Sequence, residues 1–181
     1  MRPIYLFMSL FLSACSSMVN VDYDKSVNFK NFDTYTIQLK PVRITNDTRI
    51  NTPFMLQRIE SAINNSLTRK GFFNATKKDS LVVKYYLEVK QEFETDDSGL
   101  SLGFGSYGHH SAIGFGFTVP LGETYSIDKL ILTIDMVSTK TNQLVWRGSL
   151  AAQLEQGTTP ESNSRMVNAL VEEILQSFPP K

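Results

Sequence analysis

The position of the only cysteine, Cys15, directly behind an apolar N-terminal segment constrains the fold more than any other feature of this sequence. One basic residue, Arg2, precedes the apolar run Ile4–Phe11, and small residues follow it up to Ala14. A basic start, a short apolar run and a small-residue site in this order are typical of a secretory signal. A membrane-spanning helix needs about 20 apolar residues, roughly twice this run. We therefore leave residues 1–14 out of the fold and predict cleavage between Ala14 and Cys15.

Cleavage at this point makes Cys15 the first residue of the mature chain. The tetrapeptide Leu12–Cys15 resembles a bacterial lipobox, in which the new N-terminal cysteine receives a thioether-linked lipid and acyl chains such as palmitate. We predict that Cys15 is lipidated and that its attached chains hold the protein stably on a membrane surface. A plain cleaved secretory signal is the alternative. A lipidated Cys15 cannot form a disulfide even in an oxidising compartment, so packing alone has to stabilise the fold.

Composition limits the classes of protein to which the mature chain can belong. Removal of residues 1–14 leaves 167 residues, enough for one compact domain, which we place at 19–181 behind a lipidated tether at 15–18. The chain has 18 basic and 18 acidic residues, and the signal takes one basic residue, Arg2, which leaves a balance of −1. A near-neutral chain lacks the basic patch of a nucleic-acid binder. We therefore expect no nucleic-acid partner. The expected partner is a lipid bilayer, which the protein contacts through the lipidated Cys15.

Apolar periodicity predicts two helices, each with one apolar stripe. The first helix has Thr52 as its cap and Pro53 in its first turn, and it ends near Gly71. The second begins at Thr159-Pro160 and ends before Pro179-Pro180. Period-two alternation predicts strands at residues 19–23, 34–39, 81–91, 127–137 and 144–154.

The order of these elements predicts an α+β fold. Strands with one polar face, joined mainly by hairpins and flanked by two one-sided helices, favour a two-layer sandwich. We expect a mostly antiparallel sheet with both helices on one face, and a long hairpin rich in glycine and aromatic residues inserted at residues 98–122. The first strand begins only three residues after Cys15, so a fully extended tether of roughly 10 Å holds the domain close to the membrane.

The inserted hairpin is the most unusual stretch of the sequence. Residues 99–122 hold seven of the ten glycines, and both halves alternate apolar side chains with Gly, Ser or Thr. Such alternation places the apolar side chains on one face and leaves the other nearly bare. The apolar face either folds onto the domain's own core, or belongs to a mobile loop, or contacts a protein partner, a second copy or the lipid surface. The residues predicted for an external contact are Leu102, Phe104, Tyr107, Phe115 and Phe117.

Candidate catalytic and metal-binding groups are sparse. Residues 103–108 match G-x-G-x-x-G, but another strand pattern follows instead of a helix, so we exclude a nucleotide site. His109 and His110 are the only histidines, and adjacent side chains on a strand point to opposite faces. They are therefore a weak candidate metal site, weighed against solvated histidines at a loop tip. With no free thiol and these two histidines alone, a nucleophilic triad has little to draw on, so we expect no enzyme activity and no cofactor.

Several stretches resemble a family of bacterial lipoproteins known only as domain of unknown function 4136. They are Val21–Asp24 near the start, Arg69–Phe72 and Leu81–Tyr85 in the middle, and Thr139–Gly148 with Phe178–Pro180 near the end. The resemblance covers nearly all of residues 19–180 and includes the glycine-aromatic segment. It implies an envelope lipoprotein with one α+β domain, and it supplies no activity and no catalytic residues. Ser16, in place of Asp behind the cysteine, resembles lipoproteins that Gram-negative bacteria send to the outer membrane.

Two functions remain open from the sequence. The first is an envelope lipoprotein with a non-catalytic structural or binding role, whose hairpin contacts an envelope protein, another copy or the membrane. The alternative is a periplasmic carrier of a small ligand, held between sheet and helices or beneath the hairpin. Both place the protein at the cell envelope, on the inner leaflet of the outer membrane and facing the periplasm if the host is Gram-negative.

Overall fold

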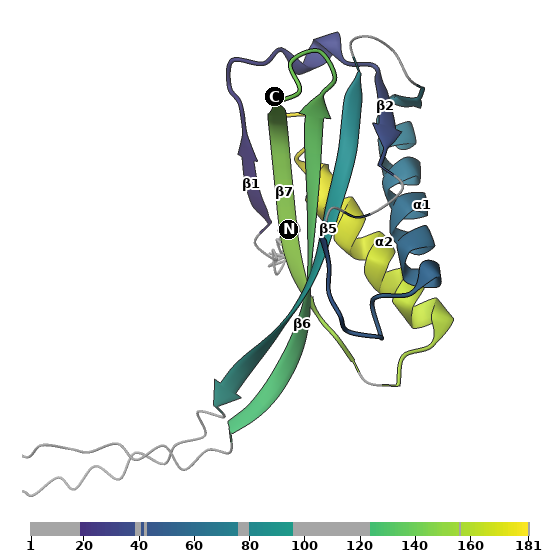
Figure 1. Cartoon of the computed structure of the whole chain (residues 1–181), viewed down its shortest axis with the longest axis vertical. Coiled ribbons are helices and arrows are strands. Elements are labelled where there is room, and N and C mark those ends of the chain that lie inside the picture. Colours follow the sequence, from purple (N-terminus) through teal and green to yellow (C-terminus); the bar gives the residue numbers. More distant parts are fainter. Residues whose placement is uncertain are drawn as a thin grey trace, which may run out of the picture.

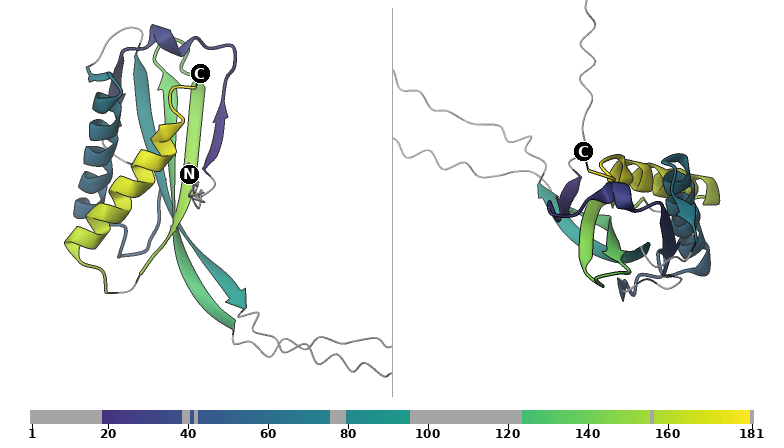
Figure 2. Two further views of the ribbon diagram at one scale, coloured as in Figure 1. Left: turned by 180° about the vertical axis from the view of Figure 1, so that it is seen from behind. Right: turned by 90° about the horizontal axis from the view of Figure 1, so that it is seen from above.

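Two helices cover one face of a β-sheet, which gives the protein two layers (Figures 1 and 2). The predicted α+β two-layer sandwich is therefore confirmed. This computed structural model describes residues 19–38, 41, 43–75, 80–95, 124–155 and 157–180. In chain order the elements are β1 (Asn20–Tyr23), η1 (Phe29–Asn31), β2 (Thr34–Ile37), β3 (Arg43–Ile44), α1 (Pro53–Arg69), β4 (Phe73–Asn74), β5 (Leu81–Thr95), β6 (Thr124–Ser138), β7 (Leu144–Gln153) and α2 (Pro160–Gln176).

The strands of the sheet lie in the order β1-β7-β6-β5-β2-β4, and β3 also pairs with β5. The long pairings, β5 with β6, β6 with β7 and β1 with β7, are antiparallel as predicted. The short strands β2, β3 and β4 join in parallel, through the pairs β2–β5, β3–β5 and β2–β4. A parallel neighbour requires a crossover connection, and α1 supplies it between β2 and β4.

Both helices begin where their capping residues predict. The Thr52 side chain accepts a hydrogen bond from the Met55 amide at the start of α1, and Thr159 forms a reciprocal capping box with Ser162 at the start of α2. Gly71 follows the end of α1 with φ +87°, the left-handed conformation in which glycine carries no Cβ penalty. The local signals at both ends of α1 are therefore confirmed.

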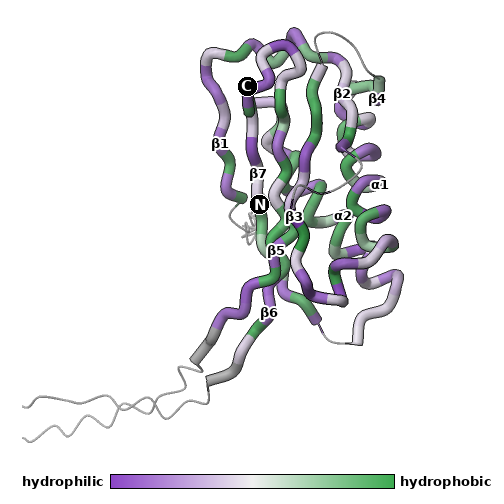
Figure 3. Tube along the Cα trace, in the orientation of Figure 1, coloured by the Kyte–Doolittle hydropathy of each residue, from purple (hydrophilic) through white to green (hydrophobic). Residues whose placement is uncertain are grey.

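A continuous apolar core lies between the sheet and the helices. Hydrophobic and hydrophilic residues alternate along β5 and β6 (Figure 3), and their inward residues are fully buried. Several aromatic rings meet at Phe178, whose ring centroid lies 5.2 Å from that of Trp146, 5.3 Å from Phe72 and 5.9 Å from Phe29. The buried core residues of the described chain lie between positions 29 and 178, so a chain that starts at Ser16 contains all of them.

The two central strands, β5 and β6, are longer than predicted and extend beyond the rest of the sheet. Their ladder runs through fifteen residue pairs to Thr95–Thr124, whereas the pairing of β6 with β7 ends at Lys129–Gln153. Residues Gln91–Thr95 and Thr124–Asp128 therefore form a two-stranded ribbon, which we call the arm. The arm projects from the body of the domain, away from both helices (Figure 1). The predicted hairpin at 98–122 lies outside the described residues.

No helix in the part of the chain that the structure describes is both long and apolar enough to cross a membrane.

Gly148 in β7 marks a close contact between the sheet and α2, and it generates a stability prediction. A Cβ atom there would lie 2.8 Å from Ile174 Cγ2 and closer still to the Trp146 ring. Because overpacking a core costs about 1–3 kcal/mol, Gly148→Ala is expected to lower the free energy of unfolding by that amount. Urea unfolding should show a lower midpoint at an unchanged slope.

Ser149→Ala provides the matched control for this substitution, because the Ser149 side chain lies on the opposite face of β7. We expect it to stay within about 0.5 kcal/mol of the wild type. A Gly148→Ala variant with a wild-type midpoint would contradict the packing described here.

Candidate functional site

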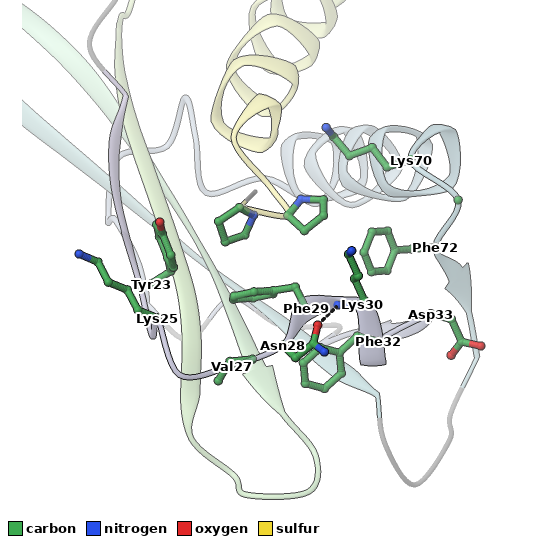
Figure 4. A pocket seen from close by; sticks show the side chains of 13 residues that line it. Tyr23, Lys25, Val27, Asn28, Phe29, Lys30, Phe32, Asp33, Lys70 and Phe72 are labelled. Atoms are coloured by element: carbon green, nitrogen blue, oxygen red, sulfur yellow. Dashed lines mark hydrogen bonds between the residues drawn. The ribbon is translucent and has the colours of Figure 1, made fainter.

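A pocket of about 580 Å³ is drawn in Figure 4, and the segments that line it lie at the end of the body opposite the arm (Figure 1). We call it the aromatic pocket. Its volume falls within the range of about 300–1,000 Å³ that is usual for small-molecule sites. Four segments far apart in the sequence build it: the end of β1 with the following loop, η1, the residues after α1 and the residues after α2. Its lining residues are Tyr23, Lys25, Val27, Asn28, Phe29, Lys30, Phe32, Asp33, Lys70, Gly71, Phe72, Pro179 and Pro180.

Phenylalanine rings form the floor of the aromatic pocket. Phe29 and Phe72 are buried and pack beneath the pocket onto Phe178, while Phe32 is half-buried beside Phe29 at a centroid distance of 6.4 Å. Tyr23 meets Phe29 edge-on at 6.3 Å. Edge-on and tilted ring pairs of this kind are favourable beyond their buried area, so the floor is held by the same contacts that hold the core.

Two lysines line this pocket, and only Lys30 lies over the floor. Figure 4 shows the Lys30 side chain between the rings of Phe29 and Phe72, and Lys70 at the end of α1 on the side of the two prolines. The backbone of η1 is fixed because the Lys30 amide donates to Asn28 Oδ1 at 3.1 Å. The Lys70 amide donates to the Leu67 carbonyl at 3.0 Å, which closes α1. Lys25 and Asp33 line the pocket but point away from its centre (Figure 4).

The tyrosines buried beneath α1 have structural partners. The Tyr85 hydroxyl donates to Glu60 Oε1 at 2.7 Å, and the Tyr35 hydroxyl donates to Asn64 Oδ1 at 2.8 Å. Burial, with the neighbouring Glu60 carboxylate, raises the pKa of Tyr85 well above its ordinary value. Both hydroxyls link the sheet to α1 and lie apart from the residues of the aromatic pocket, so we assign them to the fold.

Arg49 ties the loop before α1 to the base of the arm. Its Nη2 lies 2.7 Å from Asp128 Oδ2, and its Nε donates to Asp47 Oδ1 at 3.0 Å. The hydrogen bonds from Arg49 lower the pKa of Asp47 below its ordinary value. This bridge fixes where the arm leaves the body.

A row of alternating charges crosses the face of the sheet that the helices leave open. Lys84, Asp135, Arg147 and Asp22 occupy matched register positions on β5, β6, β7 and β1. Asp135 is buried and accepts two hydrogen bonds from Arg147, at 2.6 and 2.7 Å. The Arg147 guanidinium carbon also lies 5.7 Å from the centre of the Tyr86 ring. The pairing satisfies Asp135 within the sheet, which favours a structural role.

The sequence-predicted site residues lie outside the described residues. These are the lipidation and cleavage positions Ala14 and Cys15, the contact residues Leu102, Phe104, Tyr107, Phe115 and Phe117, and the weak metal candidates His109 and His110. They remain predictions. Within the described ranges, no three His, Cys, Asp or Glu side chains are grouped so as to hold a metal ion. Sequence reasoning missed the aromatic pocket. The signal that could have indicated it is a lysine close to a phenylalanine in two separate stretches, Phe29-Lys30 and Lys70-Gly71-Phe72.

A family model described as "Domain of unknown function (DUF4136)" matches residues 19–180. No curated protein matches the chain. Similar solved structures include a PDZ domain protein from Parabacteroides distasonis (15% identity, TM-score 0.49), a PelC dodecamer from Paraburkholderia phytofirmans (12%, 0.49) and a DUF4136 family protein from Bacteroides thetaiotaomicron (19%, 0.44).

The extent of these similarities differs between the three structures. They cover 91%, 88% and 90% of this chain, in the same order. The chain spans 36% of the PDZ domain protein, and 94% of each of the other two. With every identity below 20% and every TM-score below 0.5, these similarities transfer no function to the chain.

The Asp135–Arg147 pair generates a prediction that separates a structural role from a functional one. Arg147→Met leaves a buried carboxylate without its partner and is expected to lower the free energy of unfolding by about 2–3 kcal/mol. This is less than for a fully buried pair, because 46% of the Arg147 side chain is exposed. The double variant Asp135→Leu/Arg147→Met removes both charges and should return to within about 1 kcal/mol of the wild type. Urea unfolding measures the free energy of unfolding of each variant. A double variant that is less stable than Arg147→Met alone would refute the pairing.

Proposed function

This protein belongs to the DUF4136 family, and we propose that it is a lipid-anchored protein of the bacterial envelope with a non-catalytic binding role. The family is described as a domain of unknown function, so the proposal rests on this chain's own features. The signal, Cys15 and the short tether support the anchor. The observation that carries the binding role is the arm, which leads the chain away from the body at both Thr95 and Thr124 (Figure 1).

The arm supports an external contact for the hairpin in preference to packing on the domain's own core. The last contact of the β7 segment with this ladder is the Leu154 amide, which donates to the Asp128 carbonyl at 2.8 Å. Beyond Asp128, no other described strand pairs with the β5–β6 ladder, so its residues form a two-stranded ribbon. Ribbons of this kind are marginally stable alone, and free strand edges are templates for pairing with another chain. Residues 98–122 connect the two strands at the far end of this ribbon. We propose that they contact an envelope protein, another copy or the membrane.

The register of β1 supports a common side for the anchor and the arm. Asn20 pairs with Ser149 and Tyr23 with Trp146, so the chain enters β1 from the Gln153 end of β7. The arm leaves the body at this same end, because Gln153 lies opposite Lys129 at the base of the arm. With a tether of roughly 10 Å from Cys15, this arrangement favours an arm that points toward the bilayer. In a Gram-negative host, Ser16 favours the inner leaflet of the outer membrane.

A small-ligand carrier is the second candidate function, and the aromatic pocket favours it. The pocket lies at the opposite end of the body from the arm. Ligand binding there and partner binding at the arm are therefore compatible in one molecule.

Replacement of the predicted lipid site tests the anchor. Cys15→Ser in the full chain is expected to move the protein out of the membrane fraction and to remove the acyl mass seen by mass spectrometry. Ser16→Asp serves as the matched variant: it should keep the acyl mass and shift the protein toward the inner membrane of a Gram-negative host. A Cys15→Ser protein that stays in the membrane fraction would contradict lipid anchoring.

In-cell crosslinking tests the role of the hairpin. A photoreactive residue at Phe104 or Phe115 is expected to give a defined crosslink to a protein or to lipid. The same residue at Phe73, which is 65% exposed on β4 in the body, is the control and should not give that product. A strain whose protein lacks residues 99–118 should show the same envelope defect as a strain that lacks the whole protein. Thermal unfolding of the body should stay unchanged. The same crosslinked product from Phe73 as from the hairpin positions would count against the proposal. A deletion strain with a wild-type envelope would also count against it.

A further inference from the structure

We propose that residues 16–18 of the tether extend β1 and pair with the free outer edge of β7, which fixes Cys15 at the base of the arm. Residues 16–18 lie outside the described residues, and the edge that receives them lies within. The occupant of this edge is therefore a named segment of the same chain. The pairing itself needs no lipid, and only its consequence for the membrane rests on the proposed lipid anchor.

The outer edge of β7 is only partly covered by β1. β1 pairs with β7 from Trp146 to Ser149, whereas β7 continues to Gln153. β1 is also the last strand on this side of the sheet, and Figure 1 shows it as the shorter neighbour of β7. From Leu150 to Gln153, β7 pairs with β6 but has no neighbour on its other side within the described chain.

Two residues of this edge point their backbone groups toward the uncovered side. The Leu154 amide, one residue past β7, donates to the Asp128 carbonyl of β6 at 2.8 Å. Backbone groups of an antiparallel strand alternate between its two neighbours, so the residue before Leu154 and every second residue before that one face away from β6. The amides and carbonyls of Ala151 and Gln153 therefore face the side on which β1 lies. Unpaired groups of this kind are a template for another strand.

The register of β1 brings the tether to these unpaired groups. β1 pairs with β7 up to Ser149, and each step back along β1 moves one residue forward along β7. Continued without a break, this register places Met18 opposite Ala151 and Ser16 opposite Gln153. In each of these two pairs the residues exchange both backbone hydrogen bonds.

The described start of the chain and the length of the tether both fit this register. Val19, the residue before β1, packs against the core, and its register position is opposite the buried Leu150. The uncovered stretch of β7 has four residues, 150–153, and the chain from 16 to 19 also has four. Residues 16–18 read Ser-Ser-Met, without the proline that would remove a ladder hydrogen bond.

The pairing sets the position of the lipid relative to the arm. One step beyond Ser16, the same register brings Cys15 opposite Leu154, whose amide is bonded to Asp128 at the base of the arm. The lipid and the arm then leave the body at the same level. An anchored body held in this way presents one fixed side to the bilayer, whereas a body on an unpaired tether turns about its anchor.

Amide hydrogen exchange followed by NMR tests the pairing in the chain 15–181 with Cys15→Ser, which carries no lipid. Its reference is the chain 19–181, which lacks the tether but keeps every buried core residue of the described chain. The amides of Ala151 and Gln153 are expected to exchange roughly tenfold more slowly in the longer chain. The Ala152 amide faces β6 and is the internal control, so its exchange rate should be the same in both chains.

Two proline substitutions in the longer chain test the register. Met18→Pro removes an amide that the register directs at the Ala151 carbonyl and places the proline ring against that carbonyl. It should therefore speed exchange at Ala151 to the rate seen in the chain 19–181. Ser17→Pro is the matched control, because the Ser17 amide faces away from β7 in the same register, and it should keep the slow rate.

Two results would overturn the proposal. Equal exchange rates at Ala151 and Gln153 in the chains 15–181 and 19–181 would show that the tether does not pair with β7. Equal acceleration by Ser17→Pro and Met18→Pro would show that the pairing does not follow the register of β1. Because the tested chain carries no lipid, failure of the lipid anchor would leave this result unaffected, and failure of the pairing would leave the anchor standing.

Discussion

The antiparallel ladder between β5 and β6 is the interaction on which the rest of the structure depends. Its inner half places Leu81, Val83, Tyr85 and Leu87 opposite a matching set of buried residues on β6, and this double row faces both helices. Its outer half continues past the last β7 pair and becomes the arm. One continuous ladder therefore builds the core of the body and carries the chain out of it. Arg49, bound to Asp128, marks the boundary between the two halves.

The aromatic contacts around Phe178 explain how the other end of the body is closed without a disulfide. Trp146 from β7, Phe29 from η1 and Phe72 from the end of α1 all meet this ring. These contacts join four segments that no covalent link holds together. Phe29 and Phe72 are 8% and 6% exposed and also line the aromatic pocket, so residues that close the core form its floor. Stability and a concave apolar surface have the same origin here.

Features encoded by neighbouring residues could be predicted from the sequence, and features made by distant segments could not. Thr52, Pro53 and Gly71 mark the ends of α1 within a few residues of one another, and both helices form as predicted. The two-residue strands β3 and β4 are too short to show alternation, so their parallel pairing was not predicted. The predicted strand ends at Gln91, but cross-strand pairing with β6 extends β5 to Thr95. The aromatic pocket combines residues from positions 23–33, 70–72 and 179–180, which only the folded chain brings together.

Hydrogen–deuterium exchange measured by mass spectrometry most directly tests the claim that one ladder serves both a rigid body and a separate arm. In the isolated protein, amides of Leu81–Val89 and Leu130–Ser138 should exchange only through global unfolding. Amides of Gln91–Thr95 and Thr124–Asp128 should exchange orders of magnitude faster through local opening, and should slow when the protein is in its native envelope. Arm amides as slow as those of the body in the isolated protein would contradict the account.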